Sequence, residues 1–211
     1  MPYTRPDVYF TETLLPSVAG AGSTIPSGAF VGLAAKGPSA PTLVKSWSQY
    51  VTLYGGFVSG YTSWLPYAVY QHFTNGGGDC YVVRVLPTGA EPSTLDLLDD
   101  AGSPLTTLTV SAKNPGTWGD SVHVQVIDRS ASAGRFDLYV YNGGTTGSYI
   151  VERWNDLVMD PDSERYVESV INSVRRGSAW ITVTDAGSAT AHPDNAPKVL
   201  SPTALTGGTP R

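Results

Sequence analysis

The sequence is poor in cysteine, in positive charge and in long apolar runs, and each shortage excludes a class of protein. Cys80 is the only cysteine among 211 residues, so the chain has no intrachain disulfide and no cysteine-based metal cluster. No apolar run approaches the roughly 20 residues that span a bilayer. The first residues lack the basic and apolar regions of a secretory signal. We therefore expect a soluble protein made in the cytosol.

The acidic net charge of the chain argues against some classes of binding partner. Charged residues make up 15% of the chain, and the formal net charge is −5. Proteins dedicated to nucleic acids or to anionic membrane surfaces use an excess of Lys and Arg to contact phosphates. We therefore expect no direct nucleic-acid partner and no membrane insertion. Hydrophobic residues reach 41%, which is typical of a folded chain rather than a disordered one.

The first 26 residues show no sustained helical or strand period and contain four prolines. Within them, Val8, Tyr9 and Phe10 form a short β-prone piece. An apolar segment with no local partner must fray or dock on another surface, and pairing as an added strand is one way to dock. We predict that residues 1–26 are an extended arm.

The stretch from Ser63 to Leu86 is typical of a helix, a glycine stop and a buried strand. Ser63 has the hydroxyl of an N-cap, and Pro66 falls in the first turn, where its missing N–H costs little. The glycines at 76–78 stop the helix, because glycine reaches left-handed backbone conformations. The β-branched and aromatic run 80–86 then predicts a strand with at least one buried face.

An earlier strand and helix complete this unit. Residues 29–35 predict a strand, and Ser46 can cap a short helix that ends at Gly55-Gly56. If the two strands of the unit pair in parallel, residues 29–86 form a small α/β layer.

Residues 105–184 predict a mostly antiparallel β-rich domain with one helix. Val122, Val124 and Val126 alternate with polar residues, which is the period of a half-buried strand. A helix is predicted from Asp162 or Ser163, either of which can cap it, to a stop at Gly177. Other strands are predicted at 108–112, around 136–140, from 150 and at 179–183.

The fold class is therefore α+β or mixed, and the chain divides into four parts. These are the arm 1–26, an α/β part at 27–103, a β-rich domain at 104–186 and a polar, proline-spaced tail at 187–211. Within the second part, residues 87–104 are interpreted as a boundary or a short helical excursion.

Side chains that could carry chemistry are scattered along the sequence. His72, His123 and His192 have no spacing typical of a metal site, and Cys80 is interpreted as a buried small hydrophobe. We predict no catalytic residue, no cofactor site and no metal site, and hence no enzyme.

Three local motifs have structural explanations. The segment 76–79 follows a helix and precedes a strand, the reverse of the order in phosphate-binding loops. Asp160, Asp162 and Glu164 have the spacing of calcium ligands, but this loop lacks the required later glycine and acid. Trp118-Gly119-Asp120 is interpreted as a packed aromatic residue at a tight turn, with ligand contact as the alternative.

Several segments resemble the tail sheath proteins of contractile phage tails and related contractile injection systems. The glycine-rich junction before CYVVRV is the most specific of them. Together the segments keep the family order and span most of the chain. They are RPDVYFTE (5–12), AFVGLAAKGP (29–38) with SWSQYVTLYGG (46–56), LPYAVYQHFTNGGGDCYVVRV (65–85), and LTVSAKNPGTWGDSVHVQV (108–126) with VERWNDLVMDPDSERYVESVINS (151–173).

The sequence departs from the family pattern at both ends. Arg5-Pro6-Asp7 replaces the proline-glycine that usually precedes the Val-Tyr pair, which changes the local turn. Family members also continue past a point resembling LTGGTP (205–210) into a second large part of the sheath core, which supplies much of the tube contact and a C-terminal linking arm. We expect a truncated chain, a naturally short or split sheath, or a tail protein with another structural role.

The resemblance implies a mechanical function. Sheath subunits form a helical homopolymer around a tail tube protein, between baseplate and tail terminator proteins, and contract to drive the tube through the target cell envelope. The likeness implies that Val8, Tyr9 and Phe10 pair with a neighbouring subunit, that 104–186 is peripheral, and that the chain belongs to a virion tail assembled in the host bacterial cytoplasm. The alternative is a non-contracting tail protein, such as a cap, collar or baseplate component. A secreted enzyme or carbohydrate-binding module would need an aromatic groove or acid pair that the sequence does not place.

Overall fold

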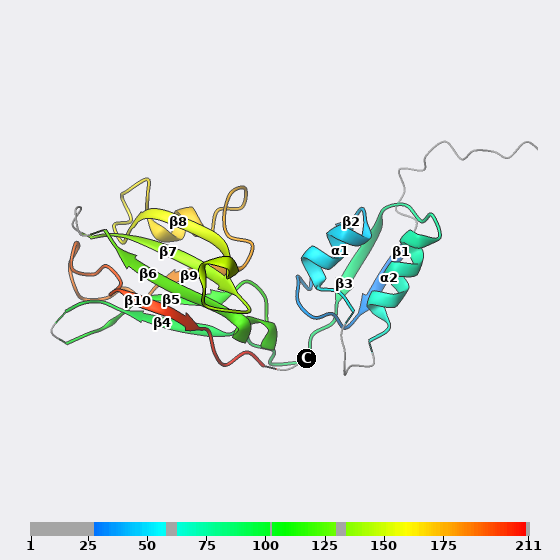
Figure 1. Cartoon of the computed structure of the whole chain (residues 1–211), viewed down its shortest axis with the longest axis horizontal. Coiled ribbons are helices and arrows are strands. Elements are labelled where there is room, and N and C mark those ends of the chain that lie inside the picture. The colour runs from blue at the N-terminus through cyan, green and yellow to red at the C-terminus, as the bar shows by residue number, and fades with distance from the viewer. Residues whose placement is uncertain (1–27, 58–62, 102, 130–133, 210–211) are drawn as a thin grey trace, which may run out of the picture.

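The computed structural model describes residues 28–57, 63–101, 103–129 and 134–209. They contain three α-helices and ten strands, and the strands form three sheets. These elements are arranged in two lobes (Figure 1). We call residues 28–86 the α/β lobe and residues 92–209 the β lobe, each without the undescribed positions. The predicted mixed α+β class is confirmed.

The α/β lobe has a three-stranded sheet in the order β1-β3-β2. Strand β1 (Gly28–Gly32) pairs in parallel with β3 (Cys80–Arg84), the arrangement on which the expected α/β layer depended. Strand β2 (Thr42–Val44) pairs antiparallel on the other side of β3. It was not predicted, because three residues are too few to leave a periodic signal. Helices α1 (Trp47–Tyr54) and α2 (Leu65–Thr74) pack on the face that carries Cys80 and Val82.

The helix ends in this lobe follow the sequence at three of four points. The Gln49 N–H donates to Ser46 Oγ at 3.1 Å, which confirms the predicted cap of α1. Gly55 ends α1 with a φ of 82°, and Gly76 follows α2 with a φ of 80°. The prediction for Ser63 is wrong: Trp64 is the N-cap of α2, and the Ser63 hydroxyl donates to the carbonyl of Leu33 instead. That bond ties the start of α2 to the chain after β1.

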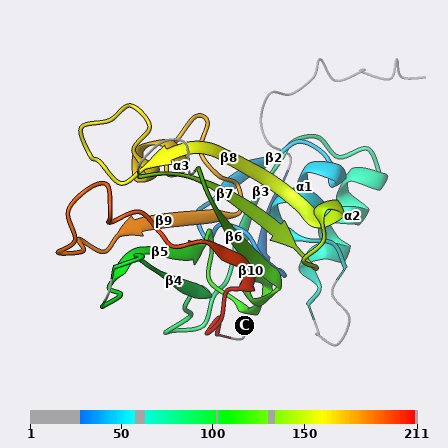
Figure 2. The ribbon, with the colours of Figure 1, turned by 60° about the vertical axis from the view of Figure 1, so that its left-hand side comes forward.

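The β lobe contains two antiparallel sheets. One has the order β10-β6-β7-β8 and the other β4-β5-β9, and Figure 2 shows them facing each other. Apolar residues of both inner faces form one core, because alternate residues of each strand point between the sheets. The strands are β4 (Thr94–Leu98), β5 (Thr106–Ala112), β6 (Val122–Asp128), β7 (Arg135–Asn142), β8 (Ile150–Val158), β9 (Ile181–Asp185) and β10 (Leu200–Ala204).

Helix α3 (Val167–Ile171) is much shorter than predicted. Its N-cap is Tyr166 and not Asp162 or Ser163, and it ends at Asn172, well before Gly177. Residues 160–166 form turns instead, because the Ser163 N–H donates to Asp160 O and the Tyr166 N–H donates to Ser163 O. At the other end, the Asn172 amide exchanges two hydrogen bonds with the backbone of Val183 in β9, which fixes the point where the helix stops.

Two strands of the β lobe lie where the sequence indicated none. Strand β4 occupies the segment interpreted as a boundary or helical excursion, so the helical alternative is wrong. Strand β10 lies in the polar tail and pairs antiparallel with β6. Its Pro202 sits on the outermost strand of the sheet, where a missing N–H is tolerated. Among the residues placed by the structure, no helix has the length and apolarity needed to cross a membrane.

Candidate functional sites

The predicted site residues Val8, Tyr9 and Phe10 lie outside the described residues. The three histidines are on separate elements: His72 Nε2 lies 2.8 Å from Gly78 O on the turn after α2, while His123 Nδ1 lies 3.1 Å from Ser121 O beside β6. Within the described ranges, no three His, Cys, Asp or Glu side chains gather in a way that could hold a metal ion. These histidines support local backbone structure.

Two other residues singled out from the sequence have structural roles. Cys80 is fully buried in the core of the α/β lobe, as predicted. Burial raises the pKa of its thiol, and the negative charge of Asp79 raises it further. Trp118 lies in the turn predicted for its segment, a 3-10 helix over Thr117–Ser121. Its indole N–H donates to Asn114 O at 3.0 Å, and Ser93 Oγ donates to Asp120 Oδ1 at 2.7 Å.

The two lobes meet at the buried guanidinium of Arg84, the last residue of β3. Its Nη1 donates to Gly37 O in the α/β lobe at 3.1 Å and to Pro115 O in the β lobe at 2.9 Å. Only 2% of Arg84 is exposed. A Cβ at Gly116 would stand 3.0 Å from Arg84 Nη2, and the φ of Gly116 is 124°, so a glycine is needed beside this side chain. Arg84 therefore joins the two lobes through hydrogen bonds.

A second contact across the junction is a cation–π interaction. Lys36 Nζ lies 4.4 Å from the ring centroid of Trp180 and 5.9 Å from that of Trp118. Burial lowers the pKa of Lys36, but the electron-rich ring faces favour its charged form. The three side chains, together with Leu53 and Lys113, line a cavity of about 320 Å³ between the lobes. No local sequence pattern indicates this arrangement, because its members come from distant segments.

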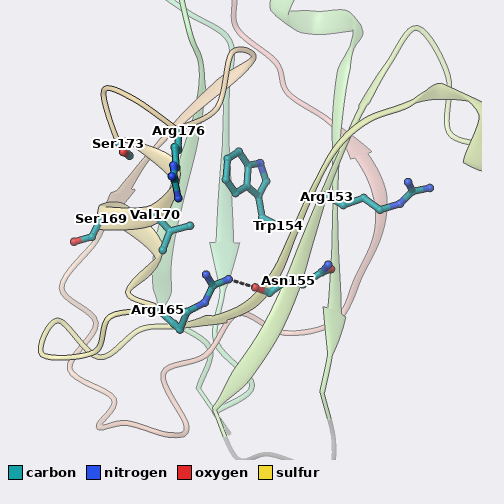
Figure 3. A pocket seen from close by; sticks show the side chains of 8 residues that line it. All are labelled: Arg153, Trp154, Asn155, Arg165, Ser169, Val170, Ser173 and Arg176. Atoms are coloured by element: carbon teal, nitrogen blue, oxygen red, sulfur yellow. Dashed lines mark hydrogen bonds between the residues drawn. The ribbon is translucent and has the colours of Figure 1, made fainter.

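A groove of about 470 Å³ lies between β8 and α3 (Figure 3). The guanidinium groups of Arg165 and Arg176 extend toward Trp154, whereas that of Arg153 points away from it and lies 5.7 Å from the ring of Tyr139. We call this site the arginine groove. Its lining residues are Arg153, Trp154, Asn155, Arg165, Ser169, Val170, Ser173 and Arg176.

Hydrogen bonds hold the walls of the arginine groove. Arg165 donates from Nε to Asp156 O at 3.1 Å and from Nη2 to Asn155 O, both on β8. The Trp154 indole N–H donates to Glu152 Oε2 at 3.0 Å, and the same carboxylate accepts from Ser178 Oγ and the Ala179 N–H. The groove is therefore pre-formed, with hydrogen-bond donors along an indole face, which is suited to an anionic group.

The positive groups extend beyond the groove along β8. Asp156, which has a φ of 62°, accepts from Arg135 at 2.7 Å and lies 3.7 Å from Arg129. The hydrogen bond from Arg135, and then the charges of Arg135, Arg129 and Arg165, lower the pKa of Asp156. The carboxylate of Asp156, on which the charge of Arg165 acts, is thus already engaged by two other arginines.

Comparison with known proteins finds solved structures whose fold is similar to that of this chain. No protein-family model matches the chain, and no curated protein matches it in sequence. Among solved structures, a sheath tail protein of Listeria innocua has a TM-score of 0.52 and 15% sequence identity, over 86% of this chain and 33% of that one. A sheath tail protein of Desulfitobacterium hafniense has a TM-score of 0.49 and 12% identity, over 96% of this chain and 39% of that one.

The match to the Listeria protein defines the class of fold. The chain spans about a third of the length of the Listeria protein, and the likeness concerns the backbone arrangement rather than particular side chains. The chain has a sheath-like fold.

Proposed function

We propose that this chain is a structural sheath subunit, or the corresponding part of one, that polymerises as a helical array around a tail tube and contracts to drive the tube through the target envelope. The observation that carries the proposal is the likeness to the Listeria sheath tail protein across 86% of the chain. The proposed partners are copies of itself, the tube protein, and the baseplate and terminator proteins, in a virion tail assembled in the host cytoplasm. The proposal includes no catalytic activity.

The α/β lobe offers surfaces for joining copies. Within the described residues, β1 and β2 form the outer strands of the sheet and pair only with β3. Outer strands leave a row of backbone donors and acceptors to which an extended segment can add. The sheet face opposite the helices also carries Val31, which is 66% exposed, and Tyr81, which is 40% exposed. These features support a contact with an apolar segment of a neighbour.

We propose that this segment is the arm 1–26 of another copy, with Val8, Tyr9 and Phe10 in contact. The proposed organisation keeps 27–103 as part of the sheath core, 104–186 as the peripheral domain and 187–211 as the segment leading toward further core structure. Strands β4 and β10 pair with strands of 104–186, so we extend the proposed peripheral domain to the whole β lobe. Repeating one such head-to-tail contact generates a helix when its rotation does not close. A polymer built this way can change lattice without unfolding its lobes.

Negative-stain electron microscopy of the purified chain over a concentration series tests the proposal. We expect tubes or striated polymers whose amount increases with concentration. Removal of residues 1–20 should abolish them while leaving the thermal unfolding of the two lobes intact. Polymers unchanged by the deletion would contradict the role of the arm. Closed rings of fixed size would instead favour the alternative of a non-contracting cap, collar or baseplate component.

A further inference from the structure

We infer that the arginine groove of one copy of this chain binds the acidic loop 160–164 of a second copy. This inference deepens the proposed function, because it rests on self-association, and it assigns a contact to the β lobe. The ligand class is a short peptide with two or three carboxylates and a proline.

The groove side supplies positive charge that is not held in an ion pair. Six of the nine arginines in the sequence fall between residues 129 and 176. Arg129 and Arg135 are paired with acids, whereas Arg165 donates to backbone carbonyls. In the part of the chain that the structure describes, no hydrogen bond or ion pair joins Arg176 to another residue, and no Asp or Glu lines the groove. Among the described residues, neither Arg165 nor Arg176 makes an ion pair, and the nearby Asp156 is already paired with Arg135.

The acidic loop supplies the opposite charge. It contains Asp160, Asp162 and Glu164 within five residues, and the last two are exposed. Among the described residues, neither Asp162 nor Glu164 makes an ion pair. The loop is shaped by its own backbone, since the Asp162 N–H donates to Asp160 Oδ1 at 3.0 Å. Its carboxylates are thus presented outward on a defined turn.

The two surfaces match in chemistry. Carboxylates accept paired hydrogen bonds from the planar guanidinium fork, which gives direction as well as charge attraction. The exposed ring of Pro161, between the acids, is an apolar surface for the half-buried indole of Trp154. A second copy is the favoured source of such a peptide, because the chain has 18 acids against 13 basic residues and its proposed neighbours are copies of itself.

The position of the loop makes each copy both donor and acceptor. The loop connects β8 to α3, the same two elements that form the groove walls. One copy can therefore fill a neighbour's groove while its own groove receives a loop. Such a contact closes as a pair or extends as an array, depending on the rotation between copies.

Sedimentation velocity of the full chain over a concentration and salt series is the test. Arg176→Glu should raise the dissociation constant of self-association about fivefold at low salt, as expected for loss of an exposed charge pair, with the difference fading at high salt. Arg175→Glu is the matched control, because it makes the same change of charge at the neighbouring exposed residue, which does not line the groove. Asp162→Arg with Glu164→Arg should weaken association similarly, and combining these changes with Arg176→Glu should restore it.

Each result has one meaning. Equal weakening by Arg175→Glu and Arg176→Glu, or no recovery in the combined variant, would overturn the contact even if tubes persist, which leaves the proposed function standing. Dimers that are weakened by Arg176→Glu, in a chain that forms no tubes, would support the contact and count against polymerisation. A chain that stays monomeric, yet binds heparin through Arg176, would overturn the second copy as occupant in favour of an acidic glycan.

Discussion

The guanidinium of Arg84 donates to the carbonyl oxygen of Pro115 across the junction between the lobes, at 2.9 Å. Arg84 ends the central strand of the α/β lobe, and Pro115 precedes the turn that starts the larger sheet of the β lobe. The same Nη1 also donates to Gly37 O. One buried side chain thus fixes a strand end, a loop and the neighbouring lobe, so the orientation of the lobes depends on it.

Arg84→Ala should lower the free energy of unfolding by about 3 kcal/mol. The substitution removes a buried charged donor and leaves the buried carbonyl oxygen of Gly37 and the partly buried one of Pro115 without it. Urea unfolding followed by tryptophan fluorescence measures the change. Proteinase K should also cut residues 85–91 faster in the variant, because the lobes lose their tie. A native-like rate of cutting would show that the Lys36 contacts suffice to hold the junction.

Asp99→Asn should make the protein less stable at pH 7 and remove the part of its acid destabilisation that sets in as the pH falls below the ordinary aspartate value of 3.8. The carboxylate of Asp99 is fully buried and accepts from Thr190 Oγ1 at 2.7 Å, Ser188 Oγ at 3.1 Å and the Leu105 N–H at 3.0 Å. The hydrogen bond from Thr190, followed by that from the Leu105 N–H, lowers the pKa of Asp99 below its ordinary 3.8.

The direction of the pH effect on stability follows from the coupling between protonation and folding. Because the folded pKa is lowered, the stabilisation by ionised Asp99 is complete above the ordinary value and is lost as the pH falls through the folded value. Urea midpoints at several pH values, compared with those of Asp100→Asn, test this. Asp100 is an exposed neighbour whose partner Lys198 is also exposed, so its variant should keep the native pH profile. Identical profiles for both variants would contradict the role of Asp99.

Ser46→Ala should destabilise the α/β lobe by about 1 kcal/mol. The substitution removes the oxygen that accepts from the Gln49 N–H and leaves the first turn of α1 without its cap. Thermal unfolding by circular dichroism measures the effect, with Ser63→Ala as comparison. Ser63 does not cap α2, so its replacement loses only the bond to Leu33. A Gly variant at position 46 should recover most of the loss.

Local chemistry was enough to predict much of the α/β lobe. Ser46, Gly55 and the glycines after α2 are signals that act within a few residues. The parallel pairing of β1 with β3 was left open by the sequence, because the order of the elements does not set the direction of the second strand. Strand β10 escaped prediction because it pairs with β6, which is distant in sequence, and β4, although it pairs with the next strand β5, is also joined at Thr94 to the segment after β10. Thr94 and Thr206 exchange backbone hydrogen bonds across the chain, a pairing that no local pattern encodes.

The candidate sites were harder to predict for the same reason. The arginine groove takes Trp154 from β8, Arg165 from a turn and Arg176 from the segment after α3. Its geometry depends on α3 ending early, where Asn172 bonds to β9. The apolar stripe around Val167 indicated a longer helix, on which Arg176 would have faced elsewhere. One feature was visible in advance, namely the concentration of arginines between 129 and 176 in an acidic chain.

Leu205→Ala should destabilise the β lobe by about 2–4 kcal/mol, as expected for a fully buried leucine truncated in a packed core. Leu205 follows β10, has no exposed surface, and its N–H donates to Val122 O at 2.9 Å. Leu98→Ala, at a position that is 46% exposed on β4, is the control and should change stability by less than about 1 kcal/mol. Equal effects of the two substitutions would mean that the segment around β10 lies loosely on the lobe. A larger effect at Leu205 would show that this polar stretch closes the core against β6.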